Sequence, residues 1–228
     1  MDDYERRLAR YEAAEKACAR ETLDDGSVMD FYSPFGPLIA RVQAPMSLVD
    51  NINSYIDRKI EAHEGPSGAQ SYADLLGSLD LEESFLSSGG EASLARQTTH
   101  WIARYLGYAD DRDLNSVRFE NFWMVRHFPG TFSPVHFHSG EISGVLYLKI
   151  PESIENEPAE LRKSYISARR AGYITFLIGG KQRFSKSIIS FKPVVGDFYI
   201  FPSWLLHAAE PFDGVGERRS MSFNAFVE

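Results

Sequence analysis

Hydrophobic and polar positions follow two different periods along the chain, and the change falls near residue 110. In the first half, apolar side chains recur at helical spacing in three stretches: 2–23, about 48–62 and 72–106, the last interrupted by Ser87-Ser88-Gly89-Gly90. A Pro- and Gly-punctuated segment over 31–42 predicts an edge strand, and 63–71 predicts a loop.

From residue 117 the pattern changes to short β-branched and aromatic runs bounded by Gly and Pro. These runs predict strands over 117–128, 143–150, 173–178, 186–192, 197–201 and 218–227. Strands at this spacing are typical of a sandwich or jelly roll, whose mouth is a common place for a metal and a small ligand. We therefore expect a mainly β protein with flanking helices.

The length of 228 residues, with 43% hydrophobic and 13% aromatic content, suits one domain with a large core. We expect a single domain over 1–228, in which 1–110 is mostly helical support and 117–228 is the jelly-roll core. The helix over 2–23 would pack on this core or make a subunit contact, so a homodimer is one option.

Charge and cysteine content narrow the functional classes. The net charge is −8 without a long basic block, which argues against a dedicated nucleic-acid surface. The single cysteine, Cys18, excludes an intrachain disulfide and fits a reducing compartment. No apolar run approaches the ~20 residues of a membrane span. We expect a cytoplasmic protein without nucleic-acid or membrane partners.

The strongest chemical signal is His136-Phe137-His138. A third histidine, His207, follows about seventy residues later, after a glycine, a predicted strand and a proline. Residues two apart on a strand point the same way, so both imidazoles would aim at one point. Paired histidines on strands also occur as surface residues or as hydrogen-bonding groups in a core. The distant third histidine favours a metal site, in which three imidazoles would leave other coordination positions open.

The order of several short motifs resembles the double-stranded β-helix of 2-oxoglutarate and iron(II)-dependent oxygenases, in particular the prolyl 4-hydroxylase-like members. The likeness runs from about residue 31 to 227 and is good from Asn121 onward. It is carried by Arg126 to Gly130, His136-Phe137-His138, Ser143 to Leu148, Gly172 to Phe176, Lys192 to Asp197, Phe201-Pro202-Ser203, His207 to Pro211 and Gly216-Glu217-Arg218. A bacterial and phage group with a closing Arg-x-Ser-x-Ser-Phe-Asn is closer still, and this chain has Arg218-Arg219-Ser220-Met221-Ser222-Phe223-Asn224.

The resemblance implies iron(II), 2-oxoglutarate as cosubstrate and dioxygen. Arg218 stands where the prolyl hydroxylase pattern carries the cation for the distal carboxylate, and an arginine fork suits a carboxylate. Ser220 would share that carboxylate, and His127 stands where the pattern often has a cosubstrate-binding Tyr. Tyr147 and Asn121 are further candidates to line the pocket, whereas Trp123 fits core packing better. Arg219 is expected to face outward as a solvated charge.

One departure concerns the metal site, because most of these oxygenases have His-x-Asp where this chain has His136-Phe137-His138. Three arrangements follow. His138 ligates in a three-histidine site, Glu141 swings in from the loop as the anionic ligand, or His136 and His207 hold the metal alone. We favour the three-histidine site, because Glu141 needs a turn of the right shape.

The sequence therefore predicts an oxygenase that hydroxylates a small-molecule or peptidyl substrate and releases succinate and CO2, with no catalytic residue beyond the metal site. One rival is a cupin-type three-histidine dioxygenase without 2-oxoglutarate. Another is a metal- or ligand-binding jelly roll without turnover. Arg218 separates them, because a cupin has no reason to aim an arginine into the barrel beside the third ligand.

Overall fold

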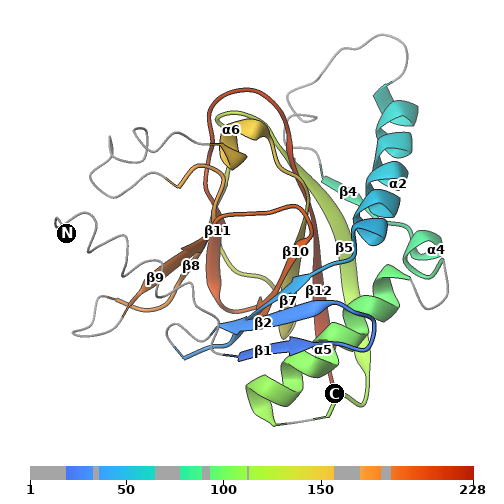
Figure 1. Cartoon of the computed structure of the whole chain (residues 1–228), viewed down its shortest axis with the longest axis vertical. Helices are drawn as coiled ribbons and strands as arrows, with labels where there is room; N and C mark the ends of the chain where they lie inside the picture. The colour runs from blue at the N-terminus through green and yellow to red at the C-terminus, as the bar shows by residue number, and fades with distance from the viewer. Residues whose placement is uncertain are drawn as a thin grey trace.

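The protein is described from a computed structural model, which covers residues 19–32, 36–64, 78–88, 93–111, 113–156, 170–180 and 186–228. Two antiparallel sheets form its centre (Figure 1). The large sheet has the order β1-β2-β3-β10-β7-β12-β5-β4, and the small sheet has the order β6-β11-β8-β9. The strands of the large sheet are β1 (Ala19–Thr22), β2 (Val28–Tyr32), β3 (Ile39–Gln43), β4 (Ser78–Asp80), β5 (Val117–His127), β7 (Ile142–Lys149), β10 (Asp197–Pro202) and β12 (Arg218–Val227).

The small sheet consists of β6 (Ser133–His136), β8 (Ile174–Leu177), β9 (Ile188–Phe191) and β11 (Leu206–Ala209). From β5 onward the chain passes back and forth between the sheets, with β5, β7, β10 and β12 as neighbours in the large sheet and β6, β8, β9 and β11 in the small one; among these described strands, β8 and β9 are the one consecutive pair in the same sheet. This interleaving is the double-stranded β-helix that the motif order predicted. The predicted strands from 117 onward all appear, with ends shifted by three residues or fewer.

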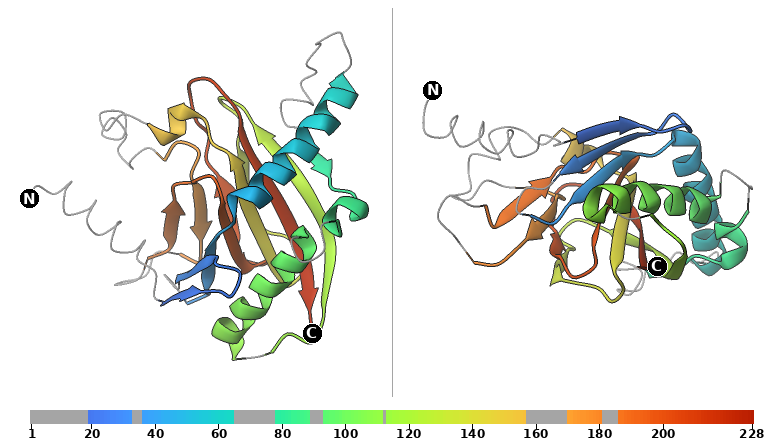
Figure 2. Two further views of the ribbon diagram at one scale, coloured as in Figure 1. Left: turned by 45° about the vertical axis from the view of Figure 1, so that its right-hand side comes forward. Right: turned by 90° about the horizontal axis from the view of Figure 1, so that it is seen from below.

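Two long helices cover the outer face of the large sheet (Figure 2). They are α2 (Met46–Glu64) and α5 (Leu94–Asp110), whereas α4 (Glu83–Leu86) and α6 (Glu152–Glu155) are single turns. The Ser93 side chain accepts a hydrogen bond from the Arg96 amide and so caps α5, which ends at Asp111 in a left-handed conformation (φ 49°). The predicted helices over 48–62 and at the end of 72–106 are confirmed.

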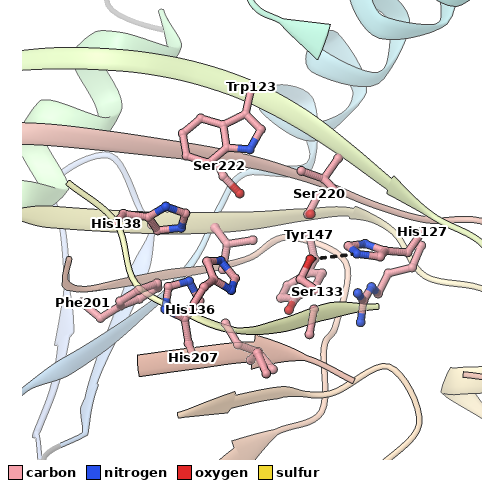
Figure 3. Close-up of a pocket in the computed structure, with 17 residues that line it drawn as sticks. Trp123, His127, Ser133, His136, His138, Tyr147, Phe201, His207, Ser220 and Ser222 are labelled. Carbon is pink, nitrogen blue, oxygen red and sulfur yellow. Dashed lines mark hydrogen bonds between the residues drawn. The ribbon is translucent and has the colours of Figure 1, made fainter. Parts of the chain in front are cut away.

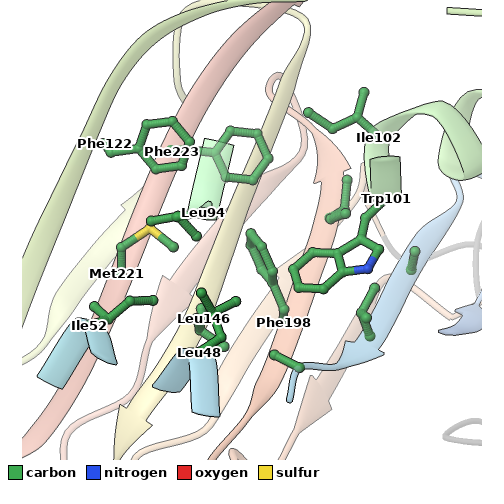
Figure 4. Packing of buried hydrophobic residues seen from close by; sticks show 14 of the residues in the cluster. Leu48, Ile52, Leu94, Trp101, Ile102, Phe122, Leu146, Phe198, Met221 and Phe223 are labelled. Carbon is green, nitrogen blue, oxygen red and sulfur yellow. The ribbon is translucent and has the colours of Figure 1, made fainter. Parts of the chain in front are cut away.

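The main core lies between these helices and the large sheet (Figure 4). Apolar side chains from α2 and α5, such as Ile52 and Trp101, pack on Phe198, Met221 and Phe223 of β10 and β12. The indole of Trp101 meets the ring of Phe198 edge-on, with centroids 5.2 Å apart. The helical first half therefore stabilises the sheet from outside and leaves its inner face free for a pocket.

The first half is less helical than predicted. Residues 19–22, at the end of the helix expected over 2–23, form β1, and the rest of that helix lies outside the described residues. The predicted edge strand over 31–42 is a pair of strands, β2 and β3, that extends the large sheet through β10. Both differences have one cause: pairing with an existing sheet edge overrides weak local periodicity. Within the described ranges, no helix has the length and apolarity needed to cross a membrane.

The expectation that Arg219 is a solvated charge is wrong. Its side chain is 2% exposed and lies on the face of β12 covered by α2. Nε donates to Glu217 at 2.8 Å, and Nη1 donates to Asp57 at 2.7 Å and to Asn53 at 3.1 Å. Strand alternation correctly predicted that Arg219 faces away from the pocket. It could not predict that α2 packs over this face and buries the side chain.

We expect Arg219→Met to lower the free energy of unfolding by about 2 to 3 kcal/mol, because the largely buried carboxylate of Glu217 would lose one of its two arginine partners and keep only Arg126. Lys149→Met is the matched control on the same face. The side chain of Lys149, whose ammonium pairs with Asp57, is 40% exposed, so its loss is expected to cost about 1 kcal/mol or less. Urea denaturation of both variants measures the difference, and equal small losses would contradict the buried-pair explanation.

Candidate functional site

A pocket of about 110 Å³ opens between the two sheets, on the opposite face of the large sheet from the helices (Figure 3). Its walls come from β5, β7 and β12 on one side and from β6, β8 and β11 on the other. The predicted site residues that line it are His127, His136, His138, Tyr147, His207, Arg218 and Ser220. Most of the candidates that are far apart in the sequence therefore meet in one place.

Three histidines converge at this pocket. His136 is the last residue of β6, His207 is its pairing partner on β11, and His138 follows two residues after β6 ends. One ring nitrogen from each lies within 4.8 Å of the others. His138 is fixed outside the strand by its amide, which donates to the carbonyl of Ser203 at 3.0 Å. The set has the donor type and spacing of a metal site.

Hydrogen bonds define which nitrogens are free in two of these rings. Nδ1 of His136 lies 2.6 Å from the carbonyl oxygen of Pro134, and Nδ1 of His207 lies 2.9 Å from that of Leu205. Because a carbonyl oxygen only accepts, each Nδ1 carries the proton and donates it. Nε2 then presents its lone pair, which is the arrangement that outer hydrogen bonds impose on metal-binding imidazoles.

Burial keeps two of the imidazoles neutral. It lowers the pKa of His207 to about 3, although the hydrogen bond to Leu205 acts in the opposite direction. Burial also lowers the pKa of His138 to about 4, and the adjacent His136 lowers it further. Both rings are therefore unprotonated near neutral pH, as a metal ligand must be.

A bulge in β6 brings a residue to the pocket that alternation would exclude. His136 pairs with His207 and Ser133 pairs with Ala209, so three steps on β6 match two on β11. Ser133 therefore faces the pocket although it lies an odd number of residues from His136. Its hydroxyl lies 3.0 Å from Nε2 of His127 (Figure 3). Period-two reasoning could not find Ser133, and only the bulge reveals it.

Arg218 lies at the closed end of the pocket and is 1% exposed. Its Nη1 donates to the carbonyl oxygens of Gly172 at 2.6 Å and Glu210 at 3.2 Å, whereas its buried Nε has no hydrogen-bond partner among the described residues. Nor does any carboxylate in the described ranges form an ion pair with it. Burial lowers the pKa of Arg218, yet the guanidinium stays charged. A buried cation without an ion-pair partner lowers the stability of a folded protein, unless a bound anion neutralises its charge.

The carbonyl that holds Arg218 depends on a glycine. Gly172 has φ +71°, which side chains rarely adopt, and a Cβ there would lie 2.3 Å from Ile154 Cδ1. The Gly172 amide donates to the carbonyl of Pro211 at 3.0 Å, which anchors this segment to the one that follows β11. Gly172 therefore places its own carbonyl oxygen against the guanidinium.

Three neighbours of Arg218 complete the closed end. His127 is its cross-strand partner on β5, and Ser220 and Tyr147 pair across β12 and β7. All three line the pocket and are buried. Burial raises the pKa of Tyr147 to about 12, so its hydroxyl remains a hydrogen-bond donor. The closed end thus offers one cation and several neutral polar groups.

Two predicted site residues are not at this end. Asn121 is exposed and does not line the pocket. It lies six residues from His127 on β5, which at about 3.4 Å per residue is about 20 Å from the Arg218 end. The structure therefore does not bring Asn121 to the predicted cosubstrate site. Glu141 Oε2 accepts a hydrogen bond from the amide of Val227 at 2.8 Å, and Glu141 is outside the histidine cluster. The turn that would aim it at the metal does not form.

The aromatic residues near the histidines also differ from expectation. Trp123 lines the pocket rather than the core, and its indole meets the ring of His138 at 5.6 Å, tilted by 69°. Phe201 is buried with its ring centroid 4.8 Å from that of His207, so it covers one side of this imidazole. Trp204, by contrast, is 57% exposed.

His127 gives the protein an expected acid sensitivity. Burial and the nearby Arg218 lower its pKa to about 3, whereas an unfolded histidine titrates near 6.5. As the pH falls below about 6.5, the unfolded chain takes up this proton and the folded chain does not, so stability is lost down to about pH 3. We expect His127→Phe to remove up to about 1.4 kcal/mol of this loss per pH unit. Denaturation from pH 7 to 4 measures it, and parallel curves for both proteins would contradict the assignment.

Comparison with protein families gives one match. Residues 121–224 match the family described as "Putative 2OG-Fe(II) oxygenase". This segment runs from the later part of β5 to most of β12 and contains all three histidines, Arg218 and Ser220. The resemblance drawn from the sequence motifs is confirmed, and the match indicates an oxygenase of this class. No curated protein is significantly similar to the chain.

Solved structures share the fold at low sequence identity. A prolyl-4-hydroxylase of Pseudomonas putida is 15% identical, with a TM-score of 0.51 over 83% of this chain and 91% of that one. HygX of Streptomyces hygroscopicus, solved with nickel and 2-oxoglutarate, is 12% identical, with a TM-score of 0.50 over 85% and 83%. The non-heme alpha ketoglutarate dependent epimerase SnoN from nogalamycin biosynthesis is 14% identical, with a TM-score of 0.50 over 97% and 84%. These likenesses support the double-stranded β-helix.

Proposed function

We propose that the protein is an iron(II)- and 2-oxoglutarate-dependent oxygenase that hydroxylates a small-molecule or peptidyl substrate. The observation that carries the proposal is the pairing of two features in one pocket. Three imidazoles converge in it, and Arg218, a buried cation without a carboxylate partner in the described residues, lies at its closed end. A ligand with a metal-chelating end and a distal carboxylate complements both features.

The residues present fit a divalent metal. His136, His138 and His207 offer one face of a coordination sphere, and Phe201 covers one side of His207. Since imidazole binds a metal as a neutral ligand, a three-histidine metal site would carry one more positive charge than a site with two histidines and a carboxylate. That charge favours anionic ligands at the remaining positions, which agrees with a cosubstrate that binds through its own carboxylate.

The closed end fits the distal carboxylate of 2-oxoglutarate. Arg218 is held by two carbonyl oxygens on Nη1, which leaves Nε without a partner among the described residues. Its fork is therefore preoriented, so little entropy is lost when a carboxylate binds. Ser220, Tyr147 and Ser133 supply hydroxyl groups around the same place. His127, neutral near pH 7, presents a buried Nδ1 that is likewise without a partner in the described chain.

Bound iron(II) would couple two reactions. One is the oxidative decarboxylation of 2-oxoglutarate by dioxygen, which gives succinate and CO2, and the other is oxidation of the substrate. The protein's own residues bind and orient. Arg218 fixes the cosubstrate by its far end, the hydrogen bonds to Pro134 and Leu205 fix the imidazole orientations, and Phe201 excludes water. Hydroxylation is the default outcome, and no further acid or base is required from the chain.

A cupin-type three-histidine dioxygenase without 2-oxoglutarate is the second candidate, and the absence of a carboxylate from the described histidine cluster favours it. Arg218 argues against it, because a buried unpaired cation at the end of the pocket serves no purpose in a reaction without an anionic cosubstrate.

The test is an anaerobic titration of the protein with iron(II) and 2-oxoglutarate, followed by admission of dioxygen. We expect 2-oxoglutarate to bind much more tightly to the metal-loaded protein than to the metal-free one, and succinate to form only when both are present. Iron binding without any 2-oxoglutarate binding would favour the cupin-type reaction. Binding of neither would reject both oxygenase functions.

A further inference from the structure

A second bulge lies in β5 beyond Trp123, on the side of the pocket away from Arg218. Asn224 of β12 pairs with Asn121, but the next residue, Ala225, pairs with Phe119, so Glu120 is an extra residue in β5. Bulges beside active sites commonly redirect a side chain. Here Phe119 packs against the main core, while Trp123, Val125 and His127 line the pocket on the opposite face. The bulge is the point at which β5 switches faces.

The carboxylate of Glu120 is held next to the metal site. The hydroxyl of Ser139 donates to Glu120 Oε2 at 2.8 Å, and Ser139 directly follows His138. Glu120 is exposed, and in the described chain only Ser139 donates to it. Its charge reaches the imidazole of His138, where it opposes the effect of burial on the pKa. Oε1 is therefore free to meet a group that approaches the histidines from solvent.

Trp123 lies on the same strand as Glu120 and next to the same histidine, His138. It lies three residues along β5 from Glu120, is only partly buried, and contacts the ring of His138 with its centroid at 5.6 Å. Figure 3 shows the indole above His138 and next to Ser222, away from His127. Organic cations are commonly bound by a cation–π contact with an aromatic ring, such as an indole, and by an ion pair with a carboxylate. Arg118, the nearest cation along β5, lies over the ring of Phe226 at 4.3 Å.

We propose that Glu120 and Trp123 form a recognition site for a positively charged group of the substrate, an ammonium or guanidinium, at the mouth of the pocket. This inference rests on the proposed function for the reaction and adds the class of substrate. The closed end then binds the anionic cosubstrate through Arg218, and the open end binds the cationic substrate through Glu120. The net charge of −8 favours approach of cations to the protein as a whole.

The test compares two probes of equal shape, choline and its neutral isostere 3,3-dimethylbutan-1-ol. Saturation-transfer NMR on the metal-free protein detects binding of either probe, and broadening of the methyl resonances by the cobalt(II)-loaded protein with 2-oxoglutarate reports closeness to the metal. We expect choline, but not its isostere, to bind and to be broadened. Glu120→Gln and Trp123→Leu should each weaken choline binding about fivefold.

Two controls separate this site from general charge effects. Glu61→Gln removes an exposed carboxylate from α2, on the other face of the large sheet, and should leave choline binding unchanged. Glu120→Asp keeps the charge and should retain part of the binding. Equal binding of both probes, or equal losses with Glu61→Gln and Glu120→Gln, would overturn the inference while leaving the oxygenase function intact. Failure to bind cobalt or 2-oxoglutarate would instead reject the proposed function, and saturation transfer would still decide the cation site.

Discussion

His207→Ala is expected to lower the affinity for iron(II) by more than the roughly 10- to 100-fold that removal of an outer hydrogen-bond partner costs a metal ligand. His207 is the buried member of the histidine cluster, and its Nε2 is free because Nδ1 donates to Leu205. Two remaining imidazoles cannot define one face of the coordination sphere. Anaerobic titration with iron(II), or with cobalt(II) as a spectroscopic probe, measures the loss, and His136→Ala should behave alike.

The matched control is His100→Ala, which removes an exposed histidine from α5. It should bind iron like the unmodified protein. Circular dichroism must show that His207→Ala remains folded, because Phe176 and Phe201 pack against this ring. Undiminished iron binding by a folded His207→Ala protein would end the metal hypothesis.

His138 and Glu141 are distinguished by the same titration. His138→Ala should weaken iron binding strongly, whereas Glu141→Gln should leave it nearly unchanged, because the Glu141 carboxylate accepts the hydrogen bond of the Val227 amide. The reverse result would make Glu141 the ligand and would require the loop after His138 to rearrange.

Arg218→Ala should weaken 2-oxoglutarate binding by roughly thirtyfold to several thousandfold and leave iron bound. Loss of one partner of a buried, hydrogen-bonded charge pair costs about 2 to 5 kcal/mol, which corresponds to this range. Arg218→Lys should restore part of the affinity, because it keeps the charge but not the fork. Calorimetry with an inert divalent metal measures the three affinities.

The control for charge is Arg118→Ala, which removes an exposed arginine from the same strand as His127. It should change 2-oxoglutarate affinity by less than about threefold. Arg219→Ala is a poor control for this purpose, because that side chain is buried in an ion-pair network under α2. Equal 2-oxoglutarate binding by the unmodified protein and Arg218→Ala would remove the cosubstrate assignment and favour the cupin-type reaction.

The sequence alone determined the fold class and the centre of the site. Alternation of apolar and polar residues in a strand reports which side faces the core, so Arg218 was correctly directed into the barrel and Arg219 away from it. The positions of His136, His138 and His207 in the sequence were likewise enough to predict that the three residues lie together, because the order of the motifs indicates which strands of this fold are neighbours. These features depend on local periodicity and topology, which a sequence contains.

Only the tertiary structure decided what breaks that periodicity. The bulges at Ser133 to His136 and at Glu120 turn side chains to a face that alternation excludes, and a third in β7 puts Leu148 and Lys149 together on the α2 side. The burial of Arg219 required a helix from a distant segment. The position of a bulge depends on the fit between two paired strands, and the position of a covering helix depends on the surface that it packs against. Neither can be predicted from the residues of a single strand.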